Sequence, residues 1–156
     1  LNKDCWQWMI PDLTDSYRVL SYDLHGHGES NDPVTEPNLS LFSKQLKDLL
    51  DYCKIQKAVI VGFSLGGMIA RRFAQDAPQN LQGMVILHSP HRRSKAAQAA
   101  ILKRVDQART IGPQSTVEAA LERWFTDPFR KANPNLMNKI RHWVKANRKE
   151  VYHTIV

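Results

Sequence analysis

The sequence contains little cysteine and no long apolar segment. Its 156 residues include two cysteines, Cys5 and Cys53, which lie far apart and fit neither a Cys-x-x-Cys pair nor a zinc-ligand spacing. We therefore expect two reduced thiols and no metal site. No apolar run approaches the roughly 20 residues that cross a bilayer, and the first ten residues lack the basic and apolar regions of a signal peptide. These absences predict a soluble, cytoplasmic protein.

Acidic residues are scarce in the second part of the chain. Residues 1–90 hold 8 Lys and Arg against 10 Asp and Glu, whereas residues 91–156 hold 14 against 5, so the net charge of +7 arises entirely after residue 90. The basic residues are spread over helical patterns instead of forming a block, and no nucleic-acid-binding motif accompanies them. We interpret them first as a solvated helical surface and second as a field that attracts an anionic small substrate. Nucleic acid and membrane are not expected as partners.

Strand patterns occur only in the first 90 residues. Residues 17–23, 57–63 and 84–89 are rich in aliphatic, β-branched and aromatic side chains. Helical patterns over residues 40–53, with Ser40 as N-cap, and over residues 66–76 stand between these runs. Continuous apolar strands with helices between them predict an α/β fold, with a parallel sheet that is covered on both faces.

After residue 90 the strand patterns stop. Residues 94–109 and 114–125 are predicted helices, and two more begin where Thr126 and Asn133 stand shortly before a proline. The last of these carries an apolar stripe at helical spacing, formed by Leu136, Ile140, Trp143 and Val144. We therefore divide the chain into an α/β part, residues 1–90, and an all-helical part, residues 91–156.

The stretch AVIVGFSLGG, residues 58–67, places a serine between glycines where a strand pattern gives way to a helix. Gly62, Ser64 and Gly66 form the pattern G-x-S-x-G, in which a strained turn lifts the serine Oγ clear of the sheet. The turn is so tight that side chains at positions 62 and 66 are expected to collide, which explains the two glycines. The N–H of Leu65, at the start of the helix, can then stabilise an oxyanion. The alternative is an ordinary connection in which the glycines turn the chain and Ser64 caps the helix.

Three stretches resemble the α/β-hydrolase superfamily, in the group whose active site lies under a helical cap. YRVLSYDLHGHGES (17–30) is similar to the family's fourth strand and D-x-R-G-H-G-x-S loop, with His25 in place of the usual Arg. AVIVGFSLGGMIA (58–70) is similar to the fifth strand with the nucleophile elbow, and MVILHSP (84–90) to the sixth. The resemblance implies a partial α/β-hydrolase fold: parallel strands with flanking helices and an inserted, all-helical cap.

The resemblance to enol-lactonases, carbon–carbon bond hydrolases and carboxylesterases also implies a function. Ser64 would be the catalytic nucleophile, Leu65 would supply an oxyanion-hole N–H, and no cofactor would be needed. The substrate would be a small ester, lactone or related compound, an anionic one if the basic cap steers it. Trp124 and Phe125 either line the substrate pocket or pack the cap onto the core.

In this family the acid and the histidine follow the cap, and the second oxyanion donor precedes the first residue of this chain. The 156 residues are therefore expected to be an internal part of a longer protein and inactive alone. His88 and His91 flank the end of the third strand pattern, but residues 87–95 contain no carboxylate to orient an imidazole, so structural roles are favoured. His27 and Asp23 are likewise interpreted as structural.

Two other function classes remain open at this point. A hydrolase-like binding module would keep the fold without a working triad, and a haloperoxidase or an acyltransferase would use the same elbow for different chemistry. The sequence carries no signal for an oligomeric state.

Overall fold

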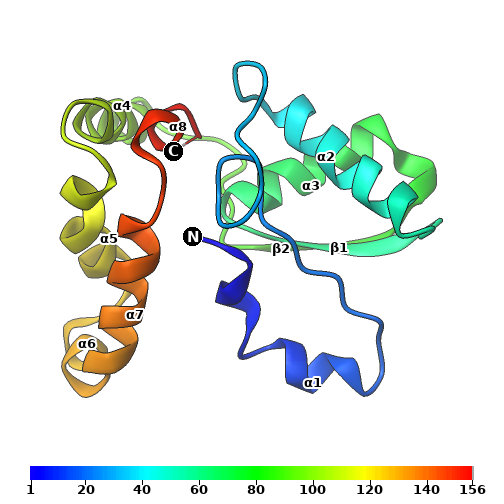
Figure 1. The fold of residues 1–156 in the computed structure, drawn as a ribbon, viewed down its shortest axis with the longest axis horizontal. Helices are drawn as coiled ribbons and strands as arrows, with labels where there is room; N and C mark the ends of the chain where they lie inside the picture. The colour runs from blue at the N-terminus through cyan, green and yellow to red at the C-terminus, as the bar shows by residue number, and fades with distance from the viewer. Residues whose placement is uncertain (156) are drawn as a thin grey trace. The chain divides into compact units, whose positions relative to one another are not determined.

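The computed structural model describes residues 1–155 (Figure 1), and these form two compact units. The sheet unit is Thr35–Gln98, and the helical unit combines Leu1–Val34 with Ala99–Val156. This grouping differs from the division at residue 90, which stays a prediction. The N-terminal segment joins the helical unit because Leu1 and Cys5 pack against the core of the C-terminal helices.

The sheet unit contains two parallel strands, β1 (Ala58–Phe63) and β2 (Leu81–Leu87). Helix α3 (Leu65–Asp76) and the 3-10 turn η2 (Pro78–Asn80) connect them, and helix α2 (Leu39–Tyr52) precedes β1. Strand β2 begins three residues earlier than its apolar pattern, because Leu81 already pairs with Ala58. At the other end Phe63 pairs with Leu87, so both strands finish together at one edge of the sheet.

The N-cap of α2 lies two residues earlier than expected. It is Asn38, whose side-chain oxygen accepts a 2.9 Å hydrogen bond from the N–H of Leu41. The prediction of Ser40 as N-cap was wrong, because Ser40 already lies inside the helix. The buried apolar faces of α2 and α3 meet each other and form the core of the unit, which consists of Phe42, Leu46, Leu50, Ile69, Ala70, Phe73 and Ala77.

One face of the sheet is covered within this unit. Both helices lie on the same side of the strands, and α3 packs on β1 and β2 (Figure 1). On the opposite face Val59, Val61 and Phe63 remain 42–51% exposed. Residues 35–98 by themselves supply helices to one face only, and coverage of the second face stays a prediction.

The helical unit begins with η1 (Lys3–Trp6) and the short α1 (Ile10–Thr14), which carries Pro11 in its first turn. Its remaining elements are α4 (Lys95–Thr110), which starts in the sheet unit, η3 (Pro113–Thr116), α5 (Val117–Trp124), α6 (Asp127–Ala132), α7 (Pro134–Lys145) and α8 (Lys149–Ile155). The prolines predicted the starts of α6 and α7 correctly. Within residues 1–155 no helix is long and apolar enough to span a bilayer.

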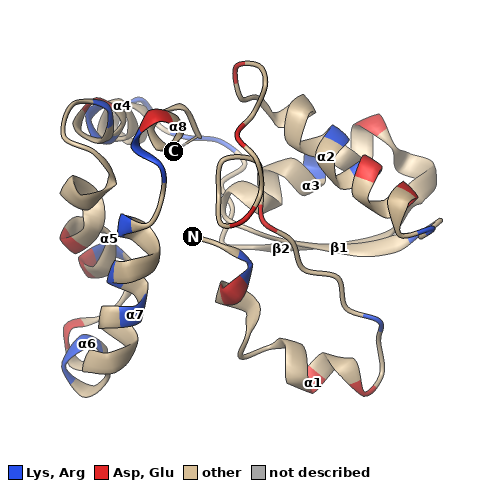
Figure 2. Cartoon of the chain, in the orientation of Figure 1, with Lys and Arg blue, Asp and Glu red and all other residues tan. Residues whose placement is uncertain are grey.

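The core of the helical unit lies between α5 and α7. It consists of Val117, Leu121, Met137, Ile140, Trp143 and Val144, so three of the four stripe residues are buried and Leu136 packs at the margin. Acidic and basic positions occur on both α5 and α7 (Figure 2). Arg141 of α7 makes a bidentate ion pair with Glu118 of α5. This pair places one basic residue of the second part of the chain on a helical surface beside an acidic partner.

Residues 18–24 form no strand in the structure. Their aliphatic and aromatic composition predicted a strand over 17–23, but a strand requires a hydrogen-bonded neighbour, and the sheet of the described residues contains only β1 and β2. The segment leads into a loop at residues 24–32 that is fixed by polar contacts described below.

Candidate active site

Ser64 lies at the turn between β1 and α3 in a strained backbone conformation. Its φ of 52° and ψ of −113° are in a region that non-glycine residues rarely occupy, at a cost of about 1–3 kcal/mol. The residue is exposed, and its backbone N–H donates a 2.9 Å hydrogen bond to the carbonyl oxygen of Leu87. The serine thus stands at the carboxyl edge of the two parallel strands, where open α/β sheets bind ligands.

The side chain of Ser64 does not cap α3. The backbone carbonyl of Ser64 accepts a 3.1 Å bond from the N–H of Gly67, but Oγ makes no capping hydrogen bond. An ordinary N-cap serine would use Oγ for this purpose. The geometry therefore argues against the capping interpretation, and it leaves the N–H of Leu65, the first residue of the helix, without a helical acceptor.

Two glycines near the serine have no room for a side chain, and they are not the expected pair. A Cβ at Gly62 would overlap the backbone carbonyl of Gly66 and come within 2.7 Å of the nitrogen of Gly67. A Cβ at Gly66 would meet no atom within 4 Å in the described structure, so the expected collision there does not occur. Gly67 is the second constrained position, because its Cβ would overlap the side chain of Ser89.

The chain turns sharply where β2 ends. His88 has a φ of 44°, and its ring stacks on that of Phe63 with centroids 6.3 Å apart. Among the described residues no carboxylate pairs with His88, so its surroundings do not match those of a triad histidine. The turn carries Ser89 over Gly67, next to the first turn of α3.

Arg71 of α3 holds this turn. Its guanidinium donates hydrogen bonds to Ser89 Oγ (3.1 Å), to the Ser89 carbonyl (3.2 Å) and to the Pro90 carbonyl (3.1 Å). Sequence reasoning missed both Arg71 and Gly67. The signal for Gly67 was its place inside a helical pattern, where glycine is unfavourable unless packing requires it. Arg71 had no comparable signal, because it stands beside Arg72 in an ordinary amphipathic helix.

A basic segment follows β2. His91, Arg92, Arg93 and Lys95 are all exposed, and the sequence has no Asp or Glu between Asp76 and Asp106. Arg93 lies with a guanidinium nitrogen 3.8 Å from the Sδ of Met68, which stands one helical turn after Ser64. Because helical side chains lean towards the N-terminus, this contact brings a positive charge towards the serine end of α3.

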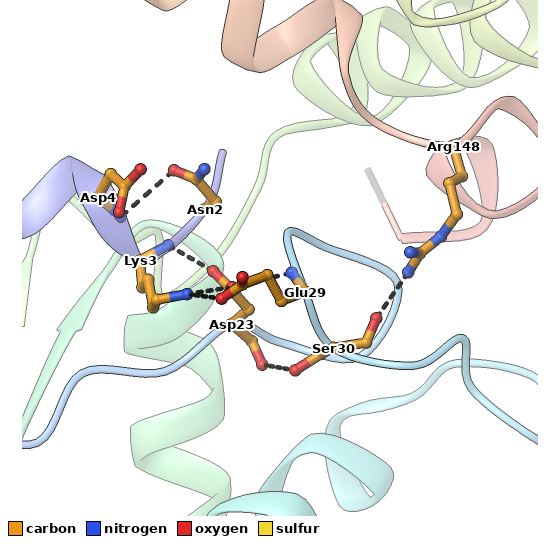
Figure 3. A network of polar contacts seen from close by, with 7 residues as sticks. All are labelled: Asn2, Lys3, Asp4, Asp23, Glu29, Ser30 and Arg148. Carbon is orange, nitrogen blue, oxygen red and sulfur yellow. Dashed lines mark hydrogen bonds and ion pairs between the residues drawn. The ribbon is translucent and has the colours of Figure 1, made fainter.

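In the helical unit, the buried carboxylate of Asp23 organises the loop that follows it (Figure 3). It accepts hydrogen bonds from the N–H groups of Lys3 (2.6 Å) and Glu29 (3.1 Å) and pairs with the Lys3 ammonium at 3.2 Å. Burial alone raises the pKa of Asp23, but these contacts together lower it below its usual value. A Cβ at Gly28 would overlap this carboxylate. These contacts agree with the interpretation of Asp23 as a structural acceptor.

The same loop is attached to the C-terminal helices of its unit. Arg148 donates a 2.8 Å hydrogen bond to the carbonyl of Ser30 and pairs with Asp32 at 2.6 Å. His27 is buried, with Nδ1 3.2 Å from the carbonyl oxygen of His25, and burial lowers the pKa of His27 to about 4. A neutral, enclosed imidazole agrees with the structural interpretation of His27.

A known protein family matches this chain along most of its length. The sequence profile of the alpha/beta hydrolase fold matches residues 2–139. The chain belongs to the α/β-hydrolase fold family. The predicted fold class is thereby confirmed, with two parallel strands, flanking helices and an all-helical part.

The chain is 28% identical over 151 residues to 3-oxoadipate enol-lactonase 2 of Acinetobacter baylyi. This alignment covers 97% of this chain and 56% of that protein. It is 32% identical over 88 residues to human epoxide hydrolase 4, covering 55% of this chain and 24% of that protein. The crystal structure of the enol-lactonase from Burkholderia xenovorans LB400 superposes with a TM-score of 0.91 at 26% identity, covering 98% of this chain and 58% of that one. The chain thus spans about half the length of the enol-lactonases that it matches.

Trp124 and Phe125, the two aromatics predicted to lie in a cap, differ in their surroundings. Phe125 packs at the margin of the α5–α7 core and stacks on Phe129 with ring centroids 5.5 Å apart. Trp124 is 42% exposed, with the guanidinium of Arg123 5.8 Å from its ring centroid. A hollow of about 380 Å³ between α5, α6 and α7 is lined by neither aromatic but largely by charged side chains. The role of Trp124 and Phe125 in a substrate pocket stays a prediction.

Proposed function

We propose that this α/β-hydrolase cleaves an ester, a lactone or a related acyl compound through an acyl-enzyme intermediate on Ser64. The observation that carries the proposal is the backbone of Ser64, an exposed serine held at φ 52° whose side chain caps no helix. Strain of this kind persists where the surrounding structure enforces it, commonly at functional sites. The likeness to enol-lactonases supports the same class of reaction.

In the proposed reaction the Oγ of Ser64 attacks the carbonyl carbon of the substrate while a base takes the hydroxyl proton. The tetrahedral oxyanion accepts a hydrogen bond from the N–H of Leu65, which has no acceptor within α3. The leaving oxygen takes the proton back from the base, and water then hydrolyses the acyl ester and frees Ser64. The base and its acid would be a histidine and a carboxylate outside the 156 residues, so residues 1–156 alone would be inactive.

The finer part of the proposal is that the acyl group of the substrate is anionic. The segment from His91 to Lys95 carries positive charge next to the edge of the sheet that holds Ser64, with no acidic residue in the surrounding sequence. Within the described residues Arg93 pairs with no carboxylate and contacts Met68 on the first turns of α3. Such a field raises the local concentration of an anionic ligand.

Turnover of p-nitrophenyl esters tests the nucleophile. The measurement uses the intact protein, meaning the chain that in this proposal also carries the base and the acid. Ser64→Ala should abolish hydrolysis, whereas Ser94→Ala should leave kcat/KM near the wild-type value. Ser94 is a matched control because it is an exposed serine whose Oγ caps α4 through the N–H of Ala97. Full turnover by Ser64→Ala would refute the proposal.

A pair of esters that differ in one terminal carboxylate tests the anionic acyl group. Arg93→Ala should raise KM for the anionic ester by about fivefold, the size of one exposed ion pair, and leave the neutral ester unchanged. Lys57→Ala is the control, since Lys57 is an exposed cation just before β1, at the opposite edge of the sheet from Ser64. Equal effects of Arg93→Ala on both esters would contradict this part of the proposal.

A further inference from the structure

Arg71 is placed to hold the strained turn at Ser64 from a distance of two helical turns. The first turn of α3 rests on the end of β2 at two points: the N–H of Ser64 bonds to the carbonyl of Leu87, and Gly67 lies against the side chain of Ser89. Both contacts depend on the course of the chain between Leu87 and Pro90.

The backbone between Leu87 and Pro90 needs contacts with other residues to keep this conformation. His88, between the two contact points, has a φ of 44°, a conformation that a non-glycine residue adopts at a cost. The carbonyls of Ser89 and Pro90 lie beyond the paired residues of β1 and β2, so the sheet ladder supplies no donor to them. The guanidinium of Arg71 supplies three hydrogen bonds to them and to Ser89 Oγ at 3.1–3.2 Å.

We infer that Arg71 is a positioning residue for the nucleophile: by fastening Ser89 and Pro90 to α3, it keeps Leu87 and Ser89 in contact with the elbow and so maintains the conformation of Ser64. Its planar fork suits the task, because two separate nitrogens present donors in fixed directions, whereas a lysine ammonium presents its three donors from one nitrogen on a flexible stem. Arg71 does not touch the substrate in this scheme. The expected effect on catalysis rests on the proposed function. The contact of Arg71 with Ser89 and Pro90 does not depend on that function.

The neighbouring Arg72 provides a matched control. It lies on the same helix and is also half-buried, but it pairs with Asp76 one turn later at 2.9 Å and has no described contact with β2. Loss of a positive charge from α3 is therefore common to Arg71→Ala and Arg72→Ala, whereas loss of the hold on β2 is specific to Arg71→Ala.

Two measurements on the intact protein test the inference. The first is hydrogen–deuterium exchange of peptides that contain Ser64, which reports on the Ser64–Leu87 bond whether or not Ser64 is a nucleophile. The second is ester turnover, where a displaced nucleophile should lower kcat by about 10- to 100-fold with little change in KM. Arg71→Ala should raise exchange at the elbow and lower kcat, Arg71→Lys should fall between it and wild type, and Arg72→Ala should resemble wild type.

The outcomes separate the two proposals. Wild-type exchange at the elbow in Arg71→Ala would overturn the inference, as would faster exchange with an unchanged kcat. If Ser64→Ala retained turnover, the proposed function would fail, and the exchange measurement would still decide whether Arg71 holds the elbow. If Arg71→Ala does not fold, Arg71→Lys and Ser89→Ala take its place, and both should raise elbow exchange above the level of Arg72→Ala.

Discussion

The backbone N–H of Ser64 and the carbonyl oxygen of Leu87 are joined by a 2.9 Å hydrogen bond. This bond lies immediately beyond the pairing of Phe63 with Leu87, so it extends the parallel ladder to the residue at which the chain leaves the sheet. The serine is therefore fixed to the neighbouring strand by its backbone, while its side chain remains free of any capping role. This arrangement is the basis of the proposed nucleophile.

The glycines of the elbow should respond differently to an added methyl group. Gly62→Ala should destabilise the protein by about 3 kcal/mol or more, because its Cβ would overlap the backbone of Gly66, which cannot move without displacing α3. Gly66→Ala should be neutral or stabilising by up to about 1 kcal/mol, since the site is open and helical. Urea denaturation of both variants measures the difference, and equal destabilisation would contradict the described geometry.

Acid should weaken the fold through His27. Burial lowers the pKa of His27 to about 4 from 6.5, so the unfolded chain binds a proton that the folded protein excludes. The stability that comes from a neutral His27 is present above pH 6.5 and is lost as the pH falls towards 4. His27→Gln should reduce the loss of unfolding free energy between about pH 7 and pH 4.5 by about 2 kcal/mol.

Urea denaturation at the two pH values measures this change. His142→Gln is the control, since His142 is exposed on α7. An unchanged pH dependence in His27→Gln would show that another group causes the acid sensitivity.

Replacing Asp23 by Asn should loosen the loop at residues 24–32. The amide lacks the charge that pairs with Lys3 and leaves at least one of the two backbone N–H donors with a poorer acceptor, so we expect a loss of about 2 kcal/mol. Asp32→Asn removes only an exposed pair with Arg148 and should cost less than about 1 kcal/mol. Thermal unfolding compares the stability of the two variants. A larger loss of stability in Asp32→Asn than in Asp23→Asn would contradict the role of Asp23 as the main organiser of the loop.

Lys139 should stabilise the attachment of the N-terminal segment to α7. Its ammonium lies 5.5 Å from the ring centroid of Trp8 and 5.3 Å from that of Trp143, and it bonds to Gln7 at 2.7 Å. Lys139→Met should cost about 1 kcal/mol and change tryptophan fluorescence, whereas Lys139→Arg should keep most of the stability. Lys145→Met, an exposed change on the same helix, should have no effect on either signal.

The sequence was most informative where a local pattern decides the structure. The apolar run before Ser64 and the helix after it predicted β1 and α3, and proline near a capping residue predicted the starts of α6 and α7. The stripe containing Ile140 and Trp143 predicted the buried face of α7. Each of these signals is local and repeats with the period of its element.

The errors arose where structure depends on partners distant in sequence. Residues 17–23 have strand composition but no strand partner among the described residues. The N-cap of α2 is Asn38 and not Ser40, because two capping residues stand two positions apart and the local pattern does not decide between them. The contacts of Arg71 with Ser89 and of Gly67 with the same residue join segments about 20 residues apart, and no periodicity encodes such contacts.

The most direct test of the central claim is to trap the nucleophile. The intact protein is treated with a fluorophosphonate, and the modified residue is located by tandem mass spectrometry. The account predicts one adduct, on the peptide that contains Ser64, and no adduct in Ser64→Ala. An adduct on another residue, or equal modification of Ser64→Ala, would contradict the assignment of Ser64 as the nucleophile.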